Sequence, residues 1–346
     1  MSPRKTLRVG IAGYGVVGKR RRHYIDAHPG LKTVAVCDQK FRGKGKMKDG
    51  VLHFRNYIDL LKTKLDVLFV CVPNYIASDA TIAGLNKGLH VFCEKPPGRT
   101  VSDIIEVRKA EKKQPKLKLK YGFNHRYHSS VKEALRIHRR GELGDLVNVR
   151  GVYGKSKIIP FSGGWRAHRK FAGGGILLDQ GIHMLDIMRL FAGDFIEAKS
   201  FISNDYWHHD VEDNAYALLR DKEGRISMLH STATQWAHRF SLEITFTEGY
   251  LRLRGILSGS KSYGQERLTI GRRNEADTGS AHEETVTYLE DHSWRDEIDE
   301  FADAVIGDKR VRSGTSADAL AVMKTIYRIY NADPVWKKKY KIEDVR

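Results

Sequence analysis

Cysteine, proline and long apolar runs are all scarce in this chain of 346 residues, which has three cysteines and eight prolines. Each cysteine (Cys37, Cys71 and Cys93) lies in a β-like apolar run. We expect small buried side chains there, because zinc ligands need closer spacing and histidine partners. No apolar run is long enough to cross a bilayer, and no signal-peptide core precedes the first strand. These absences predict a cytoplasmic protein with no metal and no membrane partner.

Acidic residues are also in deficit, with 42 Asp and Glu against 60 Lys and Arg, a net charge of +18. The basic clusters, such as Lys19–Arg22 and Lys337–Lys339, are scattered and lack interleaved aromatic residues. A nucleic-acid-binding surface would gather both kinds of residue on one face, so we expect no nucleic-acid partner. Two explanations stay open: a solvated basic surface, or electrostatic steering of an anionic substrate or cofactor.

Glycine is placed informatively near the start, where an apolar run at 8–12 leads into Gly13, Gly15 and Gly18 with G-x-G-x-x-G spacing. In a strand–turn–helix unit these glycines permit a tight turn, close approach to a pyrophosphate, and close packing of helix on strand. Asp38 follows the next β-like run, twenty residues after Gly18. A carboxylate there binds the ribose 2′-hydroxyl of NAD and repels the 2′-phosphate of NADP.

The motif therefore predicts a dinucleotide site that prefers NAD, although the nearby Arg42 leaves NADP open. The expected cofactor contacts in this part of the chain are Gly13, Tyr14, Gly15, Val16, Val17, Gly18, Asp38 and Gln39.

Apolar runs and helix-like stretches alternate over the first 125 residues, which is typical of a parallel sheet. We predict a Rossmann dinucleotide-binding domain over 1–125. Its expected strands are 7–12, 33–38, 67–72, 90–93 and 118–123, and its expected helices are 16–27, 77–87 and 101–113.

Long alternating runs replace this pattern after Gly144 and predict a mostly antiparallel sheet with one covered face. We expect an α+β substrate-binding and oligomerisation domain over 126–346, with the C-terminal helix packing back on the first domain, and the class is α/β. The expected strands are 146–153, 215–219, 226–233, 242–246 and 250–254, the expected helices are 176–190, 294–305 and 317–330, and 258–281 is expected to be a mobile loop with one short strand.

The helix predicted at 176–190 carries Asp179, His183 and Asp186, and spacings of four and three place them on one face. Carboxylates beside an imidazole can orient and tune a proton-transferring histidine. A histidine merely satisfied by its neighbours is the alternative. The glycines at 173–175 favour a functional role, because they allow close backbone approach just before this face.

A lysine follows another predicted strand in the sequence Glu94-Lys95-Pro96. Ligands bind at the carboxyl edge of an open parallel sheet, so Lys95 is placed to hold a substrate hydroxyl beside a nicotinamide. A surface turn with a lysine is the alternative. The segment Val72-Pro73-Asn74 is expected at the same edge.

Together these motifs resemble the Gfo/Idh/MocA family, the glucose–fructose oxidoreductase/inositol dehydrogenase type. Their order and spacing cover roughly half of the chain directly. The matching segments are Gly13–Gly18, Val72–Asn74, Glu94–Pro96, Gly122–Tyr127 and Gly173–Asp186.

The resemblance implies NAD(P)-dependent oxidation of a secondary hydroxyl on a sugar, cyclitol or sugar derivative, free, phosphorylated or nucleotide-linked. It implies that His183 takes the hydroxyl proton, Lys95 polarises the oxygen and Asp179 orients the pair. It further implies a homodimer or homotetramer formed through the C-terminal sheet. Additional substrate contacts are expected at Asn124, Arg126, Trp165 and Arg166, with an ion pair as the alternative for Arg166, and additional cofactor contacts at Val72, Pro73, Asn74, Glu94 and Lys95.

One position departs from the family pattern, because Ala77 stands where many relatives have a histidine. Two other functions stay open: cleavage of glycosides through transient oxidation at C3, and nucleotide binding without catalysis. The intact set of Lys95, Asp179 and His183 argues against the second, since a sensor needs no acid–base group. We interpret His208-His209-Asp210 as a solvated loop rather than a metal site.

Overall fold

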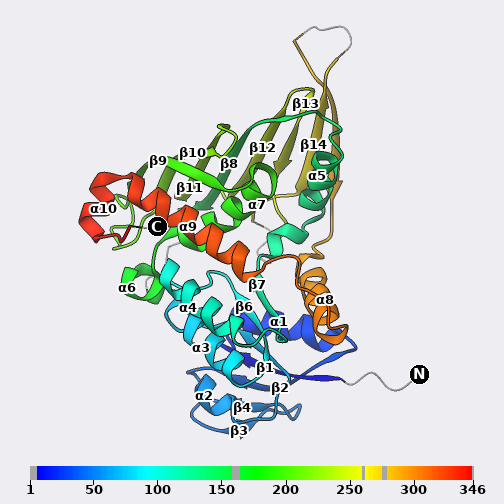
Figure 1. The fold of residues 1–346 in the computed structure, drawn as a ribbon, viewed down its shortest axis with the longest axis vertical. Coiled ribbons are helices and arrows are strands. Elements are labelled where there is room, and N and C mark those ends of the chain that lie inside the picture. Colours follow the sequence, from blue (N-terminus) through cyan, green and yellow to red (C-terminus); the bar gives the residue numbers. More distant parts are fainter. Residues whose placement is uncertain (1–5, 158–163, 259–261, 275–278, 345–346) are drawn as a thin grey trace. The chain divides into compact units, whose positions relative to one another are not determined.

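The computed structural model describes residues 6–157, 164–258, 262–274 and 279–344, which form two compact units (Figure 1). The first unit comprises Met1–Phe123, Lys170–Ala172 and Trp294–Leu320; the second comprises Asn124–Arg169, Gly173–Ser293 and Ala321–Arg346. The chain first passes from the first unit to the second after Phe123, close to the boundary expected at 125. A later segment, 294–320, returns to the first unit instead of staying with the second.

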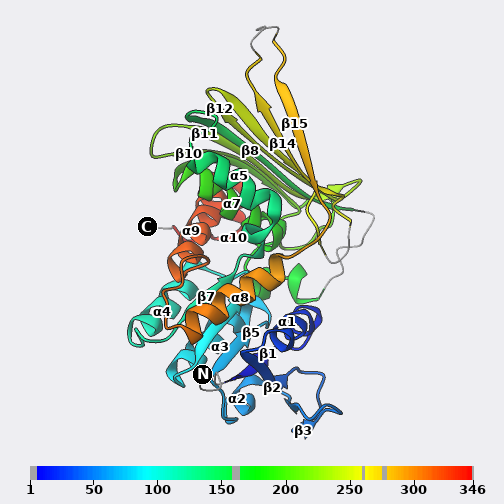
Figure 2. The same ribbon diagram turned by 90° about the vertical axis from the view of Figure 1, so that its right-hand side faces the viewer.

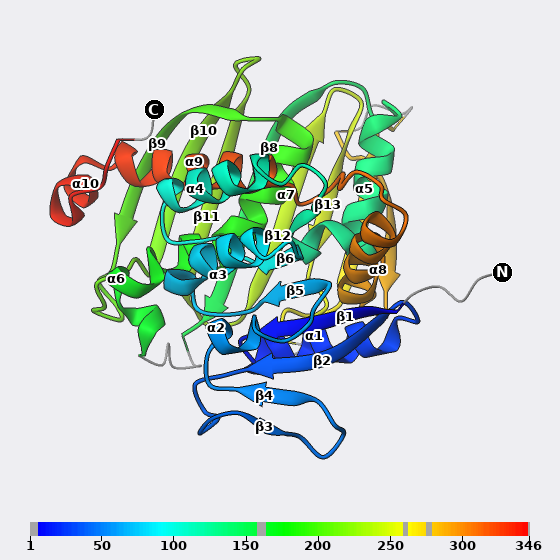
Figure 3. The same ribbon diagram turned by 60° about the horizontal axis from the view of Figure 1, so that its bottom comes forward.

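The first unit is built on a seven-stranded sheet in the order β3-β4-β2-β1-β5-β6-β7. All neighbours are parallel except β3 and β4, which pair antiparallel at one edge (Figure 3). The strands are β1 (Leu7–Ala12), β2 (Leu31–Cys37), β3 (Gly45–Lys46), β4 (Leu52–Phe54), β5 (Val67–Val70), β6 (His90–Glu94) and β7 (Leu119–Gly122). The helices are α1 (Val16–Ala27), α2 (Tyr57–Leu60), α3 (Asn74–Asn86), α4 (Val101–Lys112) and α8 (Ser293–Ile306).

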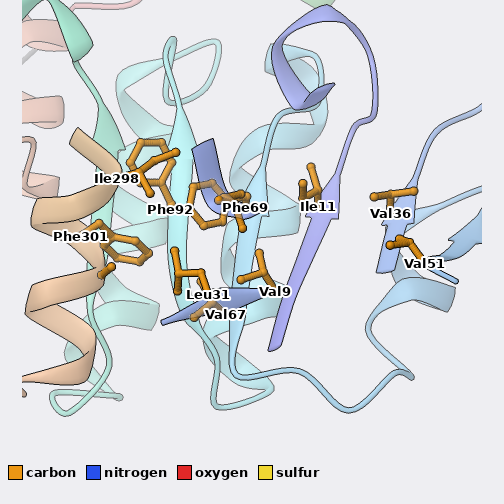
Figure 4. Packing of buried hydrophobic residues seen from close by; sticks show 12 residues of the cluster. Val9, Ile11, Leu31, Val36, Val51, Val67, Phe69, Phe92, Ile298 and Phe301 are labelled. Carbon is orange, nitrogen blue, oxygen red and sulfur yellow. The ribbon is translucent and has the colours of Figure 1, made fainter. Parts of the chain in front are cut away.

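Central strands of this sheet are apolar on both faces, because helices cover both, and the returning helix α8 completes the core (Figure 4). The rings of Phe69 and Phe92 stack with centroids 4.8 Å apart. Phe301 of α8 lies edge-on to both, at 5.9 and 5.5 Å. The segment at 294–320 is therefore part of the hydrophobic core of the first unit, which is why it groups there despite its place in the sequence.

The second unit contains an eight-stranded sheet in the order β15-β14-β13-β12-β8-β11-β10-β9. Its neighbours are antiparallel except the parallel pair of β8 and β11. The strands are β8 (Leu146–Ser156), β9 (Phe195–Ser203), β10 (Asn214–Asp221), β11 (Ile226–Gln235), β12 (Arg239–Phe246), β13 (Gly249–Arg254), β14 (Glu266–Arg272) and β15 (His282–Tyr288). Its helices include α5 (Ser129–Arg139), α7 (Ile182–Ala192), α9 (Ser316–Ala332, continuing from the first unit) and α10 (Pro334–Tyr340).

Helices α5 and α7 cover one face of this sheet, as Figure 2 shows. Along β10, Ala215, Ala217 and Leu219 point to the covered face and are buried, whereas Tyr216 and Leu218 on the other face are about half exposed. This alternation is the period of two expected for a sheet with one covered face.

Several predicted bounds are wrong. The helix expected at 176–190 begins instead with a π-helical segment, η3 (Leu177–Gly181), and becomes α-helical only at Ile182. The helix expected at 77–87 starts three residues earlier, at Asn74. Strands β9 and β15 were not expected; β15 is an edge strand with no apolar alternation, which is the usual composition of a protected edge. The segment 258–281 was expected to be a loop with one short strand, and it does contain a strand, β14; parts of it lie outside the described residues.

Cys37 and Cys93 are buried, Cys71 is half-buried, and all three are free, as their apolar contexts predicted. Burial raises the pKa of the Cys37 thiol to about 11, so it stays protonated at neutral pH. None of the described helices combines the length and hydropathy that a bilayer crossing requires.

Candidate functional site

The glycine loop between β1 and α1 has the geometry that the motif predicts. Gly13 has a φ of +92°, and a Cβ atom there would lie 2.3 Å from the carbonyl oxygen of Cys71. A Cβ on Gly18 would lie 2.0 Å from the carbonyl oxygen of Gly13, so α1 can start close to the strand only with glycine. Gly15 faces open space and Val16 is 77% exposed, which leaves the first turn of α1 accessible to a diphosphate.

Asp38 directly follows β2 and is bonded to this loop. Its Oδ2 accepts the backbone N–H of Tyr14 at 3.1 Å, and its Oδ1 accepts that of Lys40 at 3.1 Å. The Tyr14 hydroxyl accepts from Arg22 at 2.9 Å. Asp38 is half-buried and the adjacent Gln39 is exposed, so the acid is both fixed in place and accessible to a ribose.

Val72, Pro73 and Asn74 lie after β5, next to the glycine loop at the carboxyl edge of the sheet. Val72 and Pro73 are half-buried, whereas Asn74 is buried and its side-chain amide donates to the carbonyl oxygen of Ala172 at 2.7 Å. The Asn74 amide therefore ties the start of α3 to a segment from much later in the chain. Ala77, where many relatives were expected to have histidine, is buried one turn into the same helix.

Glu94 and Lys95 stand at the end of β6, on the same sheet edge as the loops after β1, β2 and β5. The Glu94 carboxylate accepts from Arg21 of α1 at 2.5 Å, and Arg21 also donates to Glu297 of α8 at 2.6 Å. Burial raises the pKa of Glu297 to about 7, against the lowering effect of Arg21. The Glu94 side chain is thus committed to an ion pair that fixes the backbone just before Lys95, which is half-buried.

In the second unit, Glu212 anchors the segment that carries Asp179 and leads to His183. Its backbone carbonyl accepts the N–H of Ile176 at 3.1 Å, and its Oε1 accepts the N–H of Leu177 at 3.1 Å. The same oxygen accepts from the Tyr330 hydroxyl at 2.7 Å. Burial raises the pKa of Glu212. These bonds hold the first turn of η3, a π-helical form that is common at functional sites.

Asp186, which was expected to share one helix face with Asp179 and His183, has an arginine as its ion-pair partner. It forms a buried two-bond ion pair with Arg126, with Arg126 Nε to Oδ2 at 2.7 Å and Nη2 to Oδ1 at 2.5 Å. Arg126 was expected to contact substrate, but its charge is neutralised within the protein. The sequence analysis missed this pair because its two residues are 60 positions apart.

His125 and Glu212 are two further site residues that the sequence analysis did not single out. The His125 ring stacks on the His183 ring with centroids 3.7 Å apart and planes 14° apart. Its neighbour Asn124 donates to Ser293 Oγ at 3.1 Å and accepts from His125. His125 was present within the Gly122–Tyr127 motif, but no spacing rule relates it to His183.

Trp165 and Arg166 form a local pair on the short 3-10 helix η2 (Trp165–Ala167). The Arg166 guanidinium lies 4.3 Å from the centre of the Trp165 ring. Arg166 is exposed and makes no ion pair with any carboxylate among the described residues, so stacking on Trp165 orients it. The same described part of the chain holds no group of three His, Cys, Asp or Glu residues spaced to bind a metal ion.

Two family models match this chain. The model described as "Oxidoreductase family, NAD-binding Rossmann fold" matches residues 7–123, and the "GFO/IDH/MocA C-terminal domain" matches 131–252. The chain belongs to the Gfo/Idh/MocA family of oxidoreductases. The glycine loop fits the NAD that the first model specifies, because its open position at Gly15 is where a side chain would otherwise block the diphosphate.

Named relatives of this Gfo/Idh/MocA protein act on sugars and cyclitols. It is 33% identical to D-glucoside 3-dehydrogenase of Escherichia coli over 250 residues, which cover 65% of this chain and 70% of that relative. It is 30% identical to inositol 2-dehydrogenase of Salmonella typhimurium over 161 residues, 45% and 48% of the two chains. The structure of levoglucosan dehydrogenase with NADH and levoglucosan has the same fold, with a TM-score of 0.81, 20% identity, and coverage of 96% and 98%.

Replacing Asp38 by asparagine is expected to relax the preference of this Gfo/Idh/MocA protein for NAD. Asparagine keeps an oxygen acceptor for the N–H of Tyr14 but removes the charge that repels a 2′-phosphate. We expect NADH to bind about 5–10-fold more weakly and NADPH more tightly than in the wild type. Titration calorimetry with both cofactors checks this, and wild-type protein that binds NADPH as tightly as NADH would contradict it.

Replacing Gly175 by alanine is expected to displace the start of η3. The new Cβ would lie 2.0 Å from the carbonyl oxygen of Glu212, which is backbone and cannot rotate away. We expect a loss of about 1–3 kcal/mol in the free energy of unfolding and a lower kcat. Gly43→Ala is the matched control, because its Cβ would meet open space. Equal unfolding midpoints of the two variants in urea would show that the contact is not restrictive.

Proposed function

We propose that this protein is an NAD-dependent dehydrogenase that oxidises a secondary hydroxyl group of a sugar, sugar derivative or cyclitol. The observation that carries this proposal is the buried His183, placed at the start of α7 directly after an anchored segment that bears Asp179. Its similarity to D-glucoside 3-dehydrogenase and inositol 2-dehydrogenase supports the substrate class.

The roles of the chain's own residues follow from their chemistry. His183 takes the proton from the substrate hydroxyl as a general base. The Lys95 ammonium donates a hydrogen bond to the same oxygen and stabilises the negative charge that develops there. Asp179 orients the catalytic group. Bound NAD supplies the hydride acceptor, so the carbon loses its hydrogen with the electron pair and becomes a carbonyl.

A neutral substrate is favoured over a phosphorylated one. Arg126, the arginine nearest to His125 in sequence, forms a buried two-bond ion pair with Asp186, which offsets its charge. Arg166 is the exposed arginine that remains among the expected substrate contacts, and its stacking on Trp165 presents a flat surface. Such a surface suits the ring of a sugar as well as a phosphate. We therefore expect free sugars and cyclitols to be better substrates than their phosphates.

Replacing Lys95 by methionine or His183 by asparagine is expected to lower kcat by about 10²–10⁴-fold without weakening NADH binding. The double variant should have about the same kcat as the less active of the two single variants. The effects of two groups that act in the same step are not additive. The assay follows the absorbance of reduced nicotinamide with methyl D-glucosides, levoglucosan, myo-inositol and their phosphates. NADH fluorescence measures cofactor binding.

Control variants and product analysis separate the alternatives. Lys87→Met, at the end of α3, is a matched lysine substitution that should leave kcat unchanged. Unchanged turnover in both His183→Asn and Lys95→Met would refute the assigned roles. Glycoside consumed without net formation of NADH would replace dehydrogenation by glycoside cleavage through transient oxidation. Cofactor binding with no conversion of any panel compound would favour a nucleotide-binding protein without catalysis.

We also propose that a second copy of the chain covers the exposed face of the large sheet, giving a homodimer or homotetramer. Strand pairing places Phe201 opposite Tyr216, and Tyr216 opposite His230 on the next strand. Phe201 is 81% exposed, and Tyr216 and Leu218 are about half exposed. Apolar side chains from two neighbouring strands, with the His230 ring stacked on Tyr216, thus form a continuous patch, which soluble proteins normally bury.

Replacing Leu218 by arginine is expected to shift the protein toward monomer, because a charge in the centre of this patch cannot be paired when a second copy packs on it. Light scattering coupled to size-exclusion chromatography measures the mass. Val335→Arg on α10 is the control, since Val335 is 75% exposed but lies outside the patch. Wild-type protein that is already monomeric at high concentration would contradict the proposal.

A further inference from the structure

A second imidazole lies directly against His183. His125 belongs to the 3-10 turn η1 (Asn124–Tyr127), and its ring stacks on that of His183 at a centroid distance of 3.7 Å. The side chains are 8% and 5% exposed. The proposed reaction uses His183 alone, which leaves a buried, ionisable ring at van der Waals distance from the base without an assigned role.

His125 is held by hydrogen bonds at both ring nitrogens. Nδ1 faces Asn124 Oδ1 at 3.2 Å, and Nε2 faces the Tyr153 hydroxyl at 3.0 Å. The Asn124 amide nitrogen donates to Ser293 Oγ, which orients Oδ1 toward His125. Since an amide oxygen only accepts, Nδ1 carries the hydrogen. The plane of the His125 ring is therefore fixed from two sides, and it in turn limits the rotation of the stacked His183 ring.

The Tyr153 hydroxyl links this arrangement back to the segment that bears Asp179. Tyr153 is hydrogen-bonded to Tyr263, whose hydroxyl donates to Gln180 Oε1 at 3.2 Å. Burial, with a smaller contribution from the charge of Asp179, raises the pKa of Tyr153 and Tyr263, so both hydroxyls stay protonated. The chain of bonds runs from Asn124 through His125 and the tyrosines to the residue next to Asp179.

His125 can accept a proton without losing a partner, because its Nε2 can either accept from the Tyr153 hydroxyl or donate to it. A second positive charge on a ring 3.7 Å away would be strongly disfavoured. The other charged groups around the two rings are paired. His128, edge-on to His125 at 5.4 Å, is bonded to Glu266, and Arg126 is bonded to Asp186. Asp179 is a further charged group near the two tyrosines.

We propose that His125 is a positioning residue for His183: it fixes the plane of the neighbouring imidazole, and the stacked pair takes up only one proton, which His125 binds first. This keeps His183 unprotonated, and so able to act as a base, at a pH where an isolated imidazole would be charged. The inference rests on the proposed function, in which His183 is the base. It assigns a role in the same reaction to a residue that does not itself touch the reacting atoms.

The test is a pH titration of the histidine ring Cε1–H signals by NMR in the full chain labelled with ¹³C-histidine. His125→Phe keeps an aromatic ring against His183 but removes the competing site for the proton. Without the repelling charge, His183 should bind its proton more easily, so its titration midpoint should rise by about one pH unit. Tyr153→Phe removes only the partner of Nε2 and should shift the midpoint in the same direction by less.

His138→Phe is the matched control. His138 lies on α5, and its ring also packs on aromatic residues, Phe191 and Phe246. It should leave the His183 midpoint unchanged. A His183 midpoint that is the same in the wild type, His125→Phe and Tyr153→Phe would overturn the proposal. If His125→Phe fails to fold, Tyr153→Phe carries the test.

Kinetics separate this inference from the proposed function. With the panel compound that is turned over fastest, His125→Phe should lower kcat about tenfold at constant KM and move the acid limb of kcat to higher pH. Loss of activity in His183→Asn with an unmoved acid limb in His125→Phe would sink the inference and leave the function standing. Full activity in His183→Asn would sink the function, while the NMR titration would still report on the pair.

Discussion

The first unit depends on one buried charge, the guanidinium of Arg21. It is fully buried between the rings of Phe92, at 4.4 Å, and Trp294, at 4.3 Å, and it pairs with Glu94 and Glu297. Burial alone would lower the pKa of Arg21, but the two carboxylates raise it, so it stays charged. Breaking such a pair leaves an uncompensated charge in the interior, which costs several kcal/mol, about 3–5 in measured cases.

This charge joins three segments that are distant in the sequence. Their relative placement shapes the edge of the sheet at which the nucleotide is expected to bind. Arg21 lies one turn after Gly18 on α1, Glu94 directly precedes Lys95, and Glu297 lies on α8. Burial raises the pKa of Glu297 to about 7, with a smaller rise from the charge of Glu94, against the lowering effect of Arg21. The returning segment at 294–320 thus supplies both apolar surface, through Phe301, and the second carboxylate bound to Arg21, that of Glu297.

The features that could be predicted from the sequence are those set by short-range spacing. The turn at Gly13, the open position at Gly15 and the close helix packing at Gly18 follow from covalent geometry over six residues. The partner of Arg21 at Glu297 is 276 residues away, and no local period encodes it. The same holds for Arg126 with Asp186 and for Glu212 with Tyr330. The π-helical form of η3 was missed because α-helical spacing predicts the same polar positions, and the deciding bonds come from Glu212.

Charge near His183 is arranged differently from charge over the whole chain. The net charge is +18, yet Arg126 with Asp186 and His128 with Glu266 form closed pairs beside the two histidines. Cations that form no ion pair among the described residues lie instead nearer the surface, as with Arg108 and Arg310 around a groove of about 580 Å³ in the first unit. Charges at the surface influence solubility and the rate at which ligands encounter the protein. Buried charges that are paired largely cancel one another, so the local electrostatic field is set by the groups that gain or lose a proton. The excess of basic residues is therefore no argument for an anionic substrate, and the single proton of the histidine pair becomes the charge that matters to the chemistry.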